Sequence, residues 1–258
     1  MNTYRLTFNT STNFKLPIGI LDIIEADAYR FGYTKGGRAN INGFLNDLIP
    51  TLSEYQEDLH QKILKYHGND REKARLAEQT IYNVYLRPFD FHDDGYVTVP
   101  FRINKKHLDR FVEIHDVKLQ YYDLDFTNYI RNLLTEYATR TADQRECLYS
   151  FSLLQQIKST IKAHKVCRFY HGKFVSIFTP VSVEITPYSR CCLIVGVDPE
   201  TSRPAVVELH QVRKMVVDDK VYKVTQEDCE VLQLYLNSIY EQEEQDNVWT
   251  KNFYESEE

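Results

Sequence analysis

Apolar residues recur with the same change of period in two segments of the chain, 13–52 and 100–137. Each segment begins with a short alternation of apolar and polar residues, which is typical of a strand with one buried face. The period then becomes helical, so both segments predict a strand, a helix, a turn and a second helix. The apolar strand positions are Phe14 and Leu16 in the first copy and Phe101 and Ile103 in the second.

The second helix gives the strongest signal in each segment, because its apolar positions follow the same spacing in both copies. Asn40 and Asp125 precede these helices as candidate N-caps. We therefore expect an internal repeat in which each second helix buries one face. The apolar positions are Ile41, Phe44, Leu45, Leu48, Ile49 and Leu52 in the first copy, and Phe126, Tyr129, Ile130, Leu133, Leu134 and Tyr137 in the second.

This order of elements, with the sequence Gly-Arg-Ala-Asn-Ile-Asn before and into the second helix of the first copy, resembles the ribbon-helix-helix family of transcriptional regulators. In that family two chains pair their strands into an antiparallel ribbon, and the outward side chains enter the DNA major groove. Two copies in one chain imply an intrachain pseudo-dimer. Its outward positions are Asn13, Lys15, Pro100 and Arg102. The alternative to DNA reading is that the ribbon serves assembly of the protein or binds another ligand.

After a helix that begins near Phe151, the pattern changes to five short β-like runs separated by turn residues. Short strands at such regular spacing predict a small β-barrel. The runs are 165–171, 173–187, 190–198, 204–212 and 214–224.

The order of these features resembles the WYL domain, a family with an Sm-like barrel. Arg168 and Tyr170 match its first strand, and Pro180 matches its second. Cys191, Cys192 and Leu193 occupy the Trp-Tyr-Leu signature positions, and Gln211 stands where the family has an Arg. The ligand site of that family is therefore altered in this chain.

The formal net charge of −6 argues against nucleic-acid binding, but much of the negative charge lies after Ile239. Basic residues gather around the predicted barrel, where they are interleaved with aromatic residues. Such a surface attracts phosphates and stacks unpaired bases, so it favours single-stranded RNA over duplex DNA. The alternative places Phe169 and Phe174 in the core and the lysines on a solvated helix face. The candidate binding residues are Lys162, Lys165, Arg168, Tyr170, His171, Lys173, Arg190, Arg203 and Arg213.

Thr225 and Asp228 form a candidate capping box before a last helix, whose apolar stripe predicts a packing surface. The stripe and an aromatic cluster near the end of the chain are candidates for a homodimer contact, with docking inside the chain as the alternative. The stripe comprises Leu232, Tyr235, Leu236 and Ile239, and the cluster comprises Trp249, Phe253 and Tyr254.

Catalytic activity is not expected, because the sequence holds no nucleophile elbow, P-loop, metalloprotease or dinucleotide-binding motif. Five cysteines without a CxxC pair, and without histidines at zinc-ligand spacing, predict reduced thiols, no cofactor and no metal. The chain begins without a long apolar segment, and no later stretch is long enough to span a membrane, so we expect a cytoplasmic protein with no membrane contact.

We expect an α+β protein in five parts. These are a first ribbon-helix-helix unit (1–54), a helical connector (55–96), a second unit (97–145), a WYL-like β-barrel (146–224), and a C-terminal helix with an acidic tail (225–258).

Ribbon-helix-helix units joined to a WYL domain resemble the WYL accessory proteins of type VI-D CRISPR systems. That resemblance implies a non-catalytic regulator that binds single-stranded RNA and modulates a partner RNA-guided RNase. Two alternatives remain. One is a DNA-binding transcriptional regulator whose WYL-like domain senses a ligand, and the other is a protein-interaction scaffold.

Overall fold

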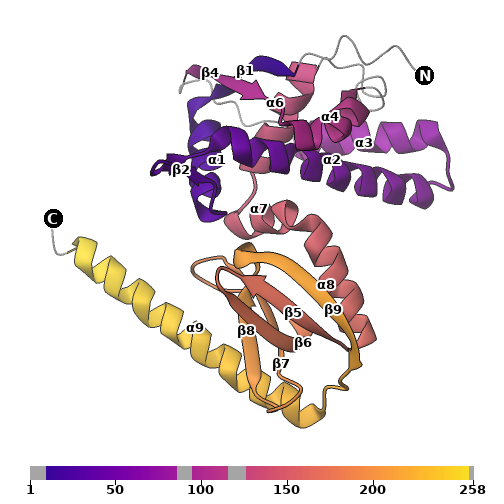
Figure 1. Ribbon diagram of the computed structural model, residues 1–258. Helices are drawn as coiled ribbons and strands as arrows, with labels where there is room; N and C mark the ends of the chain where they lie inside the picture. The colour runs from indigo at the N-terminus through magenta and orange to yellow at the C-terminus, as the bar shows by residue number, and fades with distance from the viewer. Residues whose placement is uncertain (1–9, 86–94, 116–125, 256–258) are drawn as a thin grey trace. The chain divides into compact units, whose positions relative to one another are not determined.

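The computed structural model describes residues 10–85, 95–115 and 126–255, and it has the α+β character expected from the sequence (Figure 1). The chain divides into two compact units at Thr141 and Ala142, and each unit is described by itself. Among the described residues, no helix combines the length and the apolarity that crossing a bilayer requires.

The first unit contains two two-stranded sheets and a layer of helices. In chain order its elements are β1 (Ser11–Pro17), α1 (Ile18–Arg30), β2 (Thr34–Lys35), β3 (Arg38–Ala39), α2 (Ile41–Tyr66), α3 (Arg71–Tyr85), β4 (Tyr96–Arg102), the 3-10 turn η2 (Lys105–His107), α4 (Leu108–Glu113) and α6 (Phe126–Ala138). The two sheets pair β1 with β4 and β2 with β3. The candidate N-cap Asp125 lies outside the described residues.

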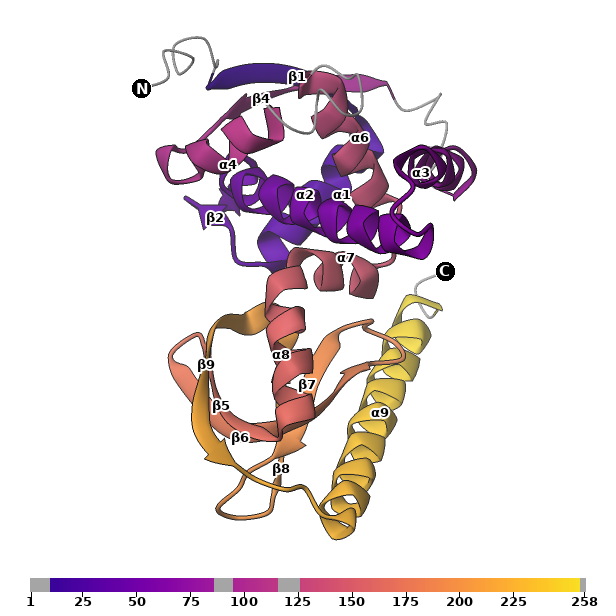
Figure 2. The ribbon, with the colours of Figure 1, turned by 90° about the vertical axis from the view of Figure 1, so that its right-hand side faces the viewer.

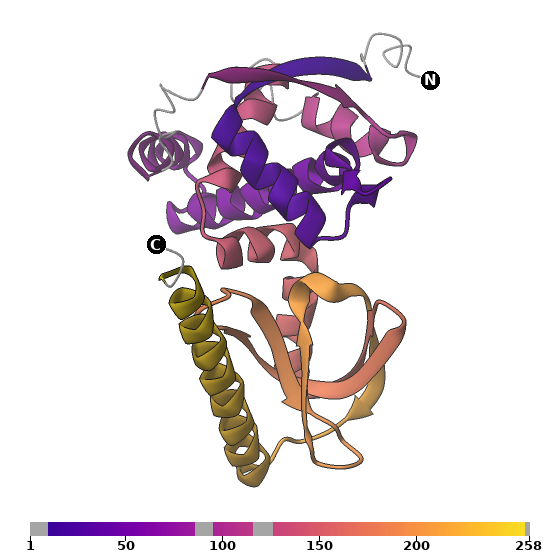
Figure 3. The same ribbon diagram turned by 90° about the vertical axis from the view of Figure 1, so that its left-hand side faces the viewer.

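Strands β1 and β4 pair with each other in antiparallel orientation, as the repeat predicts for an intrachain ribbon (Figure 3). Phe14, Leu16 and Phe101 lie on its inner face and are at most 1% exposed. The extent of the second strand differs from the prediction: β4 starts at Tyr96 and ends before Ile103. Ile103 is still buried, and its N–H donates to the Thr10 carbonyl at 2.8 Å.

Helices α2 and α6 bury the apolar faces that the repeat predicts, except that the first position of each, Ile41 and Phe126, is only partly buried. The Asn40 side chain accepts a hydrogen bond from the Gly43 N–H at 3.0 Å, which confirms this N-cap. Helix α2 continues to Tyr66 without a break, so the first unit of the repeat and the connector share one helix.

Asn46 is a fully buried polar residue of α2 that fixes the segment after β4. Its amide donates to the Arg102 carbonyl at 2.9 Å, and its carbonyl accepts from the Asn104 N–H at 2.8 Å. Because a buried polar group is costly unless it is hydrogen-bonded, these two bonds specify how the ribbon sits on α2.

The second unit contains a five-stranded antiparallel sheet in the order β8-β7-β6-β5-β9 and helices on both of its faces. Its elements are α7 (Ala142–Tyr149), α8 (Phe151–Ala163), β5 (Lys165–His171), β6 (Phe174–Ile185), β7 (Cys192–Val197), β8 (Pro204–Glu208), the 3-10 turn η4 (Leu209–Gln211), β9 (Val212–Val221) and α9 (Gln226–Glu255). All five predicted β-runs form strands, but the expected closed barrel is wrong: in the described part of the chain, no pairing joins β8 to β9.

Two separate cores hold the sheet (Figure 2). Helix α8 contacts β5, β6 and β9 through a cluster that includes Ile157, Phe169 and Phe178, whose two rings stack at 4.5 Å. Helix α9 contacts β7 and β8, where Leu232 and Leu236 pack against Leu193 and Val195. Strand β7 is buried along its whole length because both helices cover it.

The apolar stripe of α9 therefore docks inside the chain, which is the second of the two uses expected for it. Leu232 and Leu236 are 4% and 5% exposed, and Ile239 packs against the same cluster. Tyr235, predicted to belong to the stripe, lies on the outer side of the helix and is 42% exposed. The side chains of the cluster at 249, 253 and 254 lie outside the described residues.

The capping box before α9 is confirmed. The Asp228 carboxylate accepts from the Thr225 N–H at 2.8 Å, and the Asp228 N–H donates to the Thr225 hydroxyl at 3.1 Å. The Thr225 N–H, followed by the hydroxyls of Thr225 and Tyr222, lowers the pKa of Asp228. A carboxyl group with a lowered folded-state pKa stabilises the fold above its unfolded pKa, and this contribution is lost as the pH falls through the folded pKa.

We accordingly expect Asp228→Asn to lower the free energy of unfolding by about 1 kcal/mol at neutral pH. The difference from wild type is expected to be smaller at about pH 3, because this lies below the usual aspartate pKa of about 3.9 and the unfolded state then binds the proton that the folded state resists. Urea unfolding of both proteins at the two pH values measures this, with Glu227→Gln in the same helical turn as the control. An equal difference at both pH values would contradict a contribution from the Asp228 charge.

Candidate nucleic-acid interface

The outer face of the sheet around β5 combines basic, aromatic and aliphatic side chains. Opposite residues of paired antiparallel strands point to the same face. Arg168 pairs with Ile177 of β6 and Val216 of β9, and Tyr170 pairs with Val175 and Lys214 of the same two strands. We call this set of residues the β5 face: Arg168, Tyr170, Val175, Ile177, Lys214 and Val216.

Exposure distinguishes the β5 face from the opposite face of the same strands. Val175 and Ile177 are 49% and 48% exposed. Cys167 and Phe169, which point the other way, are fully buried under α8, and burial raises the pKa of the Cys167 thiol to about 11. The β5 face is therefore open surface rather than core.

The charges of the β5 face are only partly neutralised within the fold. Arg168 pairs with Asp218 of β9 at 3.2 Å, although the arginine side chain stays 47% exposed. The Lys214 ammonium lies 5.8 Å from the centre of the Tyr170 ring, in a cation–π arrangement. A polyanion can compete for Arg168, because an exposed ion pair is worth little in water.

Four further candidate residues lie in α8, β5, β9 and the turn between β5 and β6, and they are not members of the β5 face. Lys162 is exposed in the last turn of α8, and Lys165 at the start of β5 pairs with the exposed Asp219 at 3.6 Å. Lys173 is exposed in the turn between β5 and β6, where Gly172 has a positive φ of 57°. The remaining residue, Arg213, is an exposed residue of β9.

His171 is half-buried at the end of β5, and its Nε2 lies 2.8 Å from the Ser176 hydroxyl. Its ring also contacts Phe174 at 6.1 Å. Phe174 is 73% exposed, whereas Phe169 is sealed in the core. The interpretation that places these rings on the surface is therefore right for Phe174, and the interpretation that places them in the core is right for Phe169.

The structure does not bring Arg190 and Arg203 to the β5 face. Arg190 lies before β7, where its guanidinium contacts the carboxylate of the buried Asp143 at 2.9 Å and 3.0 Å. This ion pair ties the turn before β7 to α7. Arg203 is exposed in the turn between β7 and β8, at the other end of β7.

The predicted ribbon residues lie together on the outward face of β1 and β4. Asn13 and Lys15 are exposed, with Pro100 and Thr98 as their partners across the ribbon, and Arg102 is exposed opposite Ser11. The two cations stand at different ends of the paired region. The face thus offers separated charges rather than one dense basic patch.

Sequence reasoning missed Val175, Ile177, Lys214 and Val216, which complete the β5 face. Their place depends on the pairing of β5 with β6 and β9, and the pairing with β9 contains two register shifts. Periodicity along one strand shows which residues share a side. It does not show which residues of a distant strand lie opposite them.

Comparison with protein-family models finds no match, and no curated protein matches the sequence. Solved structures do match. The chain has the fold of a protein described as "Crystal structure of a CRISPR Cas-related protein". The two share 14% sequence identity and a TM-score of 0.60, and the match covers 88% of this chain and 67% of the other. At this identity the likeness extends to the fold.

Proposed function

We propose that this chain is a non-catalytic, CRISPR-associated accessory protein that binds single-stranded RNA through the β5 face and modulates an RNA-guided RNase. The observation that supports it most is the open β5 face, where Tyr170 lies opposite Lys214 of β9 and on the same side of β5 as Arg168. The shared fold with a CRISPR Cas-related protein supports the biological setting. The order of the sheet and its flanking helices is compatible with an altered WYL domain, and the paired β1 and β4 with tandem ribbon-helix-helix units.

Binding at this face combines two physical contributions. Arg168 and Lys214, with Lys173 nearby, neutralise phosphates and release counterions, which makes the affinity depend on salt. Tyr170 offers a ring for stacking, and the exposed Val175 and Ile177 lie beside it as apolar contacts for an unpaired base. A duplex hides its base faces, so the second contribution is available only to a single strand.

The second candidate function is DNA binding through the ribbon. It is favoured by the exposure of alternate residues along both strands, since Asn13, Lys15, Thr98 and Arg102 all point outward. In the family that this ribbon resembles, those positions meet the major groove. A scaffold function without nucleic-acid binding is the remaining alternative.

Binding of matched single-stranded RNA, single-stranded DNA and duplex DNA at two salt concentrations tests the proposal. We expect RNA to bind tightest, with an affinity that falls as salt rises by a log–log slope of about 0.7 for each phosphate neutralised. Fluorescence anisotropy of end-labelled 20-mers measures both quantities. A preference for duplex DNA would favour DNA binding through the ribbon. Absence of binding to all three nucleic acids at low salt would favour the scaffold function.

The link to an RNase requires a second measurement. Cleavage of a reporter RNA by a type VI-D effector should change rate when the chain is added, while the chain alone cleaves nothing. If the cleavage rate is unchanged although the chain binds RNA, the proposed effect on the RNase is wrong, whereas the proposed RNA binding stands.

A further inference from the structure

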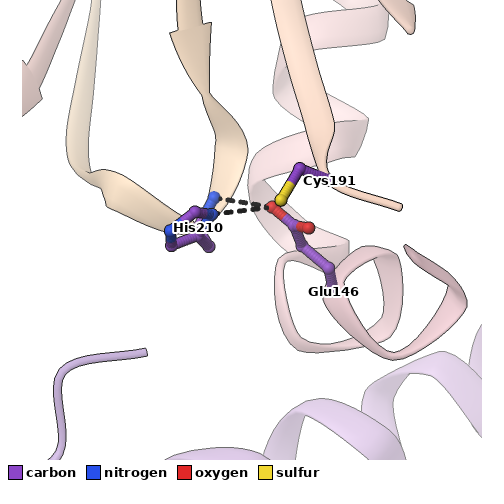
Figure 4. Close-up of side chains that lie close together, drawn as sticks. All are labelled: Glu146, Cys191 and His210. Atoms are coloured by element: carbon purple, nitrogen blue, oxygen red, sulfur yellow. Dashed lines mark hydrogen bonds and ion pairs between the residues drawn. The ribbon is translucent and has the colours of Figure 1, made fainter. Parts of the chain in front are cut away.

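Three side chains in the second unit that are far apart in sequence direct their ligand atoms at one another (Figure 4). Glu146 comes from α7, Cys191 stands just before β7, and His210 lies in η4. A carboxylate oxygen, the thiol sulfur and a ring nitrogen all lie within 4.8 Å of one another. They meet at the altered signature positions of the sheet, outside the β5 face.

Both ring nitrogens of His210 lie near a carboxylate. Its Nε2 lies 3.2 Å from a carboxylate oxygen of Glu208. The same oxygen accepts from the Gln211 side chain at 2.6 Å, so Glu208 is held in place. A neutral ring that carries its proton on Nε2, beside the Glu208 carboxylate, presents a lone pair at Nδ1.

That lone pair faces another acceptor. His210 Nδ1 is buried without a hydrogen-bond partner, and it lies 3.4 Å from Glu146 Oε1. Glu146 is fully buried, and its two oxygens accept the N–H groups of Cys192 at 3.1 Å and His210 at 2.8 Å. A cation placed between the Nδ1 lone pair and Glu146 Oε1 would satisfy both acceptors.

We propose that Glu146, Cys191 and His210 bind a zinc ion. Sulfur, imidazole nitrogen and carboxylate oxygen are the ligands that Zn²⁺ takes, and a set of this mixed softness excludes Mg²⁺ and Ca²⁺. Glu208 completes the arrangement, because metal-bound histidines usually donate their second N–H to a carboxylate. Cys191 binds as the thiolate, and its proton passes to solvent.

The geometry requires a small movement. Ligand atoms around a tetrahedral zinc lie about 3.5 Å apart, which the Glu146–His210 pair already satisfies at 3.4 Å. Cys191 is only partly buried and its Sγ lies 4.0 Å from the Ser189 carbonyl oxygen, so closing the remaining distance requires its side chain to rotate inward. It also borders a cavity of about 360 Å³ that Glu208, Glu243 and Asp246 line as well.

Cobalt titration of the full chain, purified under reducing conditions and stripped with chelator, tests the site. We expect a thiolate-to-cobalt charge-transfer band with one equivalent of Co²⁺, removed by one equivalent of Zn²⁺. Cys191→Ser should abolish the band and weaken Zn²⁺ binding about 100-fold. His210→Gln should have the same two effects, although it leaves Cys191 in place. A competing chromophoric chelator measures the Zn²⁺ affinity.

Two cysteine variants are the matched controls. Cys147 lies in α7 with its sulfur 3.6 Å from that of Cys192, and Cys229 is exposed in α9. Cys147→Ser and Cys229→Ser should both keep the band and the affinity. Circular dichroism of every variant verifies the fold, which the similar size of serine should preserve.

Three results would overturn the proposal. The wild type could bind no Zn²⁺ tighter than the Cys191→Ser variant, the band could survive in that variant, or it could disappear in Cys147→Ser. The RNA-binding assay is independent of all three results, because none of these residues belongs to the β5 face.

Discussion

Alanine at Arg168, Tyr170 and Lys214 together is expected to weaken single-stranded RNA binding about 100-fold at low salt. Loss of the ring removes about 1 to 3 kcal/mol of stacking, and a tenfold change in affinity corresponds to about 1.4 kcal/mol. The two lost cations should also reduce the log–log salt slope by about 1.4. The three side chains lie on one open face, so the fold should not suffer.

Two control variants identify which surface binds. Lys15→Ala with Arg102→Ala removes the same number of cations from the ribbon and should leave RNA affinity nearly unchanged. Arg203→Ala removes a cation of the second unit that lies away from the β5 face, in the turn between β7 and β8. If the ribbon variant loses as much affinity for single-stranded RNA as the β5 variant, the proposal that RNA binds at the β5 face is wrong. If only duplex DNA binding falls in the ribbon variant, the ribbon is a second nucleic-acid site.

Gly196→Ala is expected to lower the free energy of unfolding of the second unit by more than about 3 kcal/mol. Gly196 lies in β7 opposite Pro180 of β6. A Cβ atom there would stand 2.2 Å from the backbone oxygen of Thr179 and 2.5 Å from the Phe178 ring. A backbone oxygen in a paired strand cannot move aside cheaply, so β6 and β7 would have to separate.

Gly172→Ala provides the comparison for this variant. Gly172 has a positive φ of 57°, but a Cβ atom there meets nothing within 4 Å. The cost is then only the backbone preference, about 1 to 2 kcal/mol. Urea unfolding followed by tyrosine fluorescence measures both variants. Equal losses would show that the close approach of β6 and β7 relaxes without penalty.

The sequence by itself determined the local elements of this protein. Alternation in β1 and helical spacing in α2 and α6 fixed which side chains are buried, because a buried face imposes its period on the chain. The capping box at Thr225 and Asp228 was equally visible, since both partners lie within one helical turn. The five strands of the sheet followed from short apolar runs between turn residues.

Only the tertiary structure decided which of these side chains meet. Arg168 lies within β5 and Arg190 just before β7. Arg168 stays on an open face in an exposed ion pair with Asp218, whereas Arg190 pairs with the buried Asp143. Glu146 and His210 are 64 positions apart and meet because α7 and η4 lie at the same end of β7. Periodicity is a property of neighbouring residues. Strand register, sheet closure and the ion pairing of each charged side chain depend on contacts between segments that are distant in the sequence.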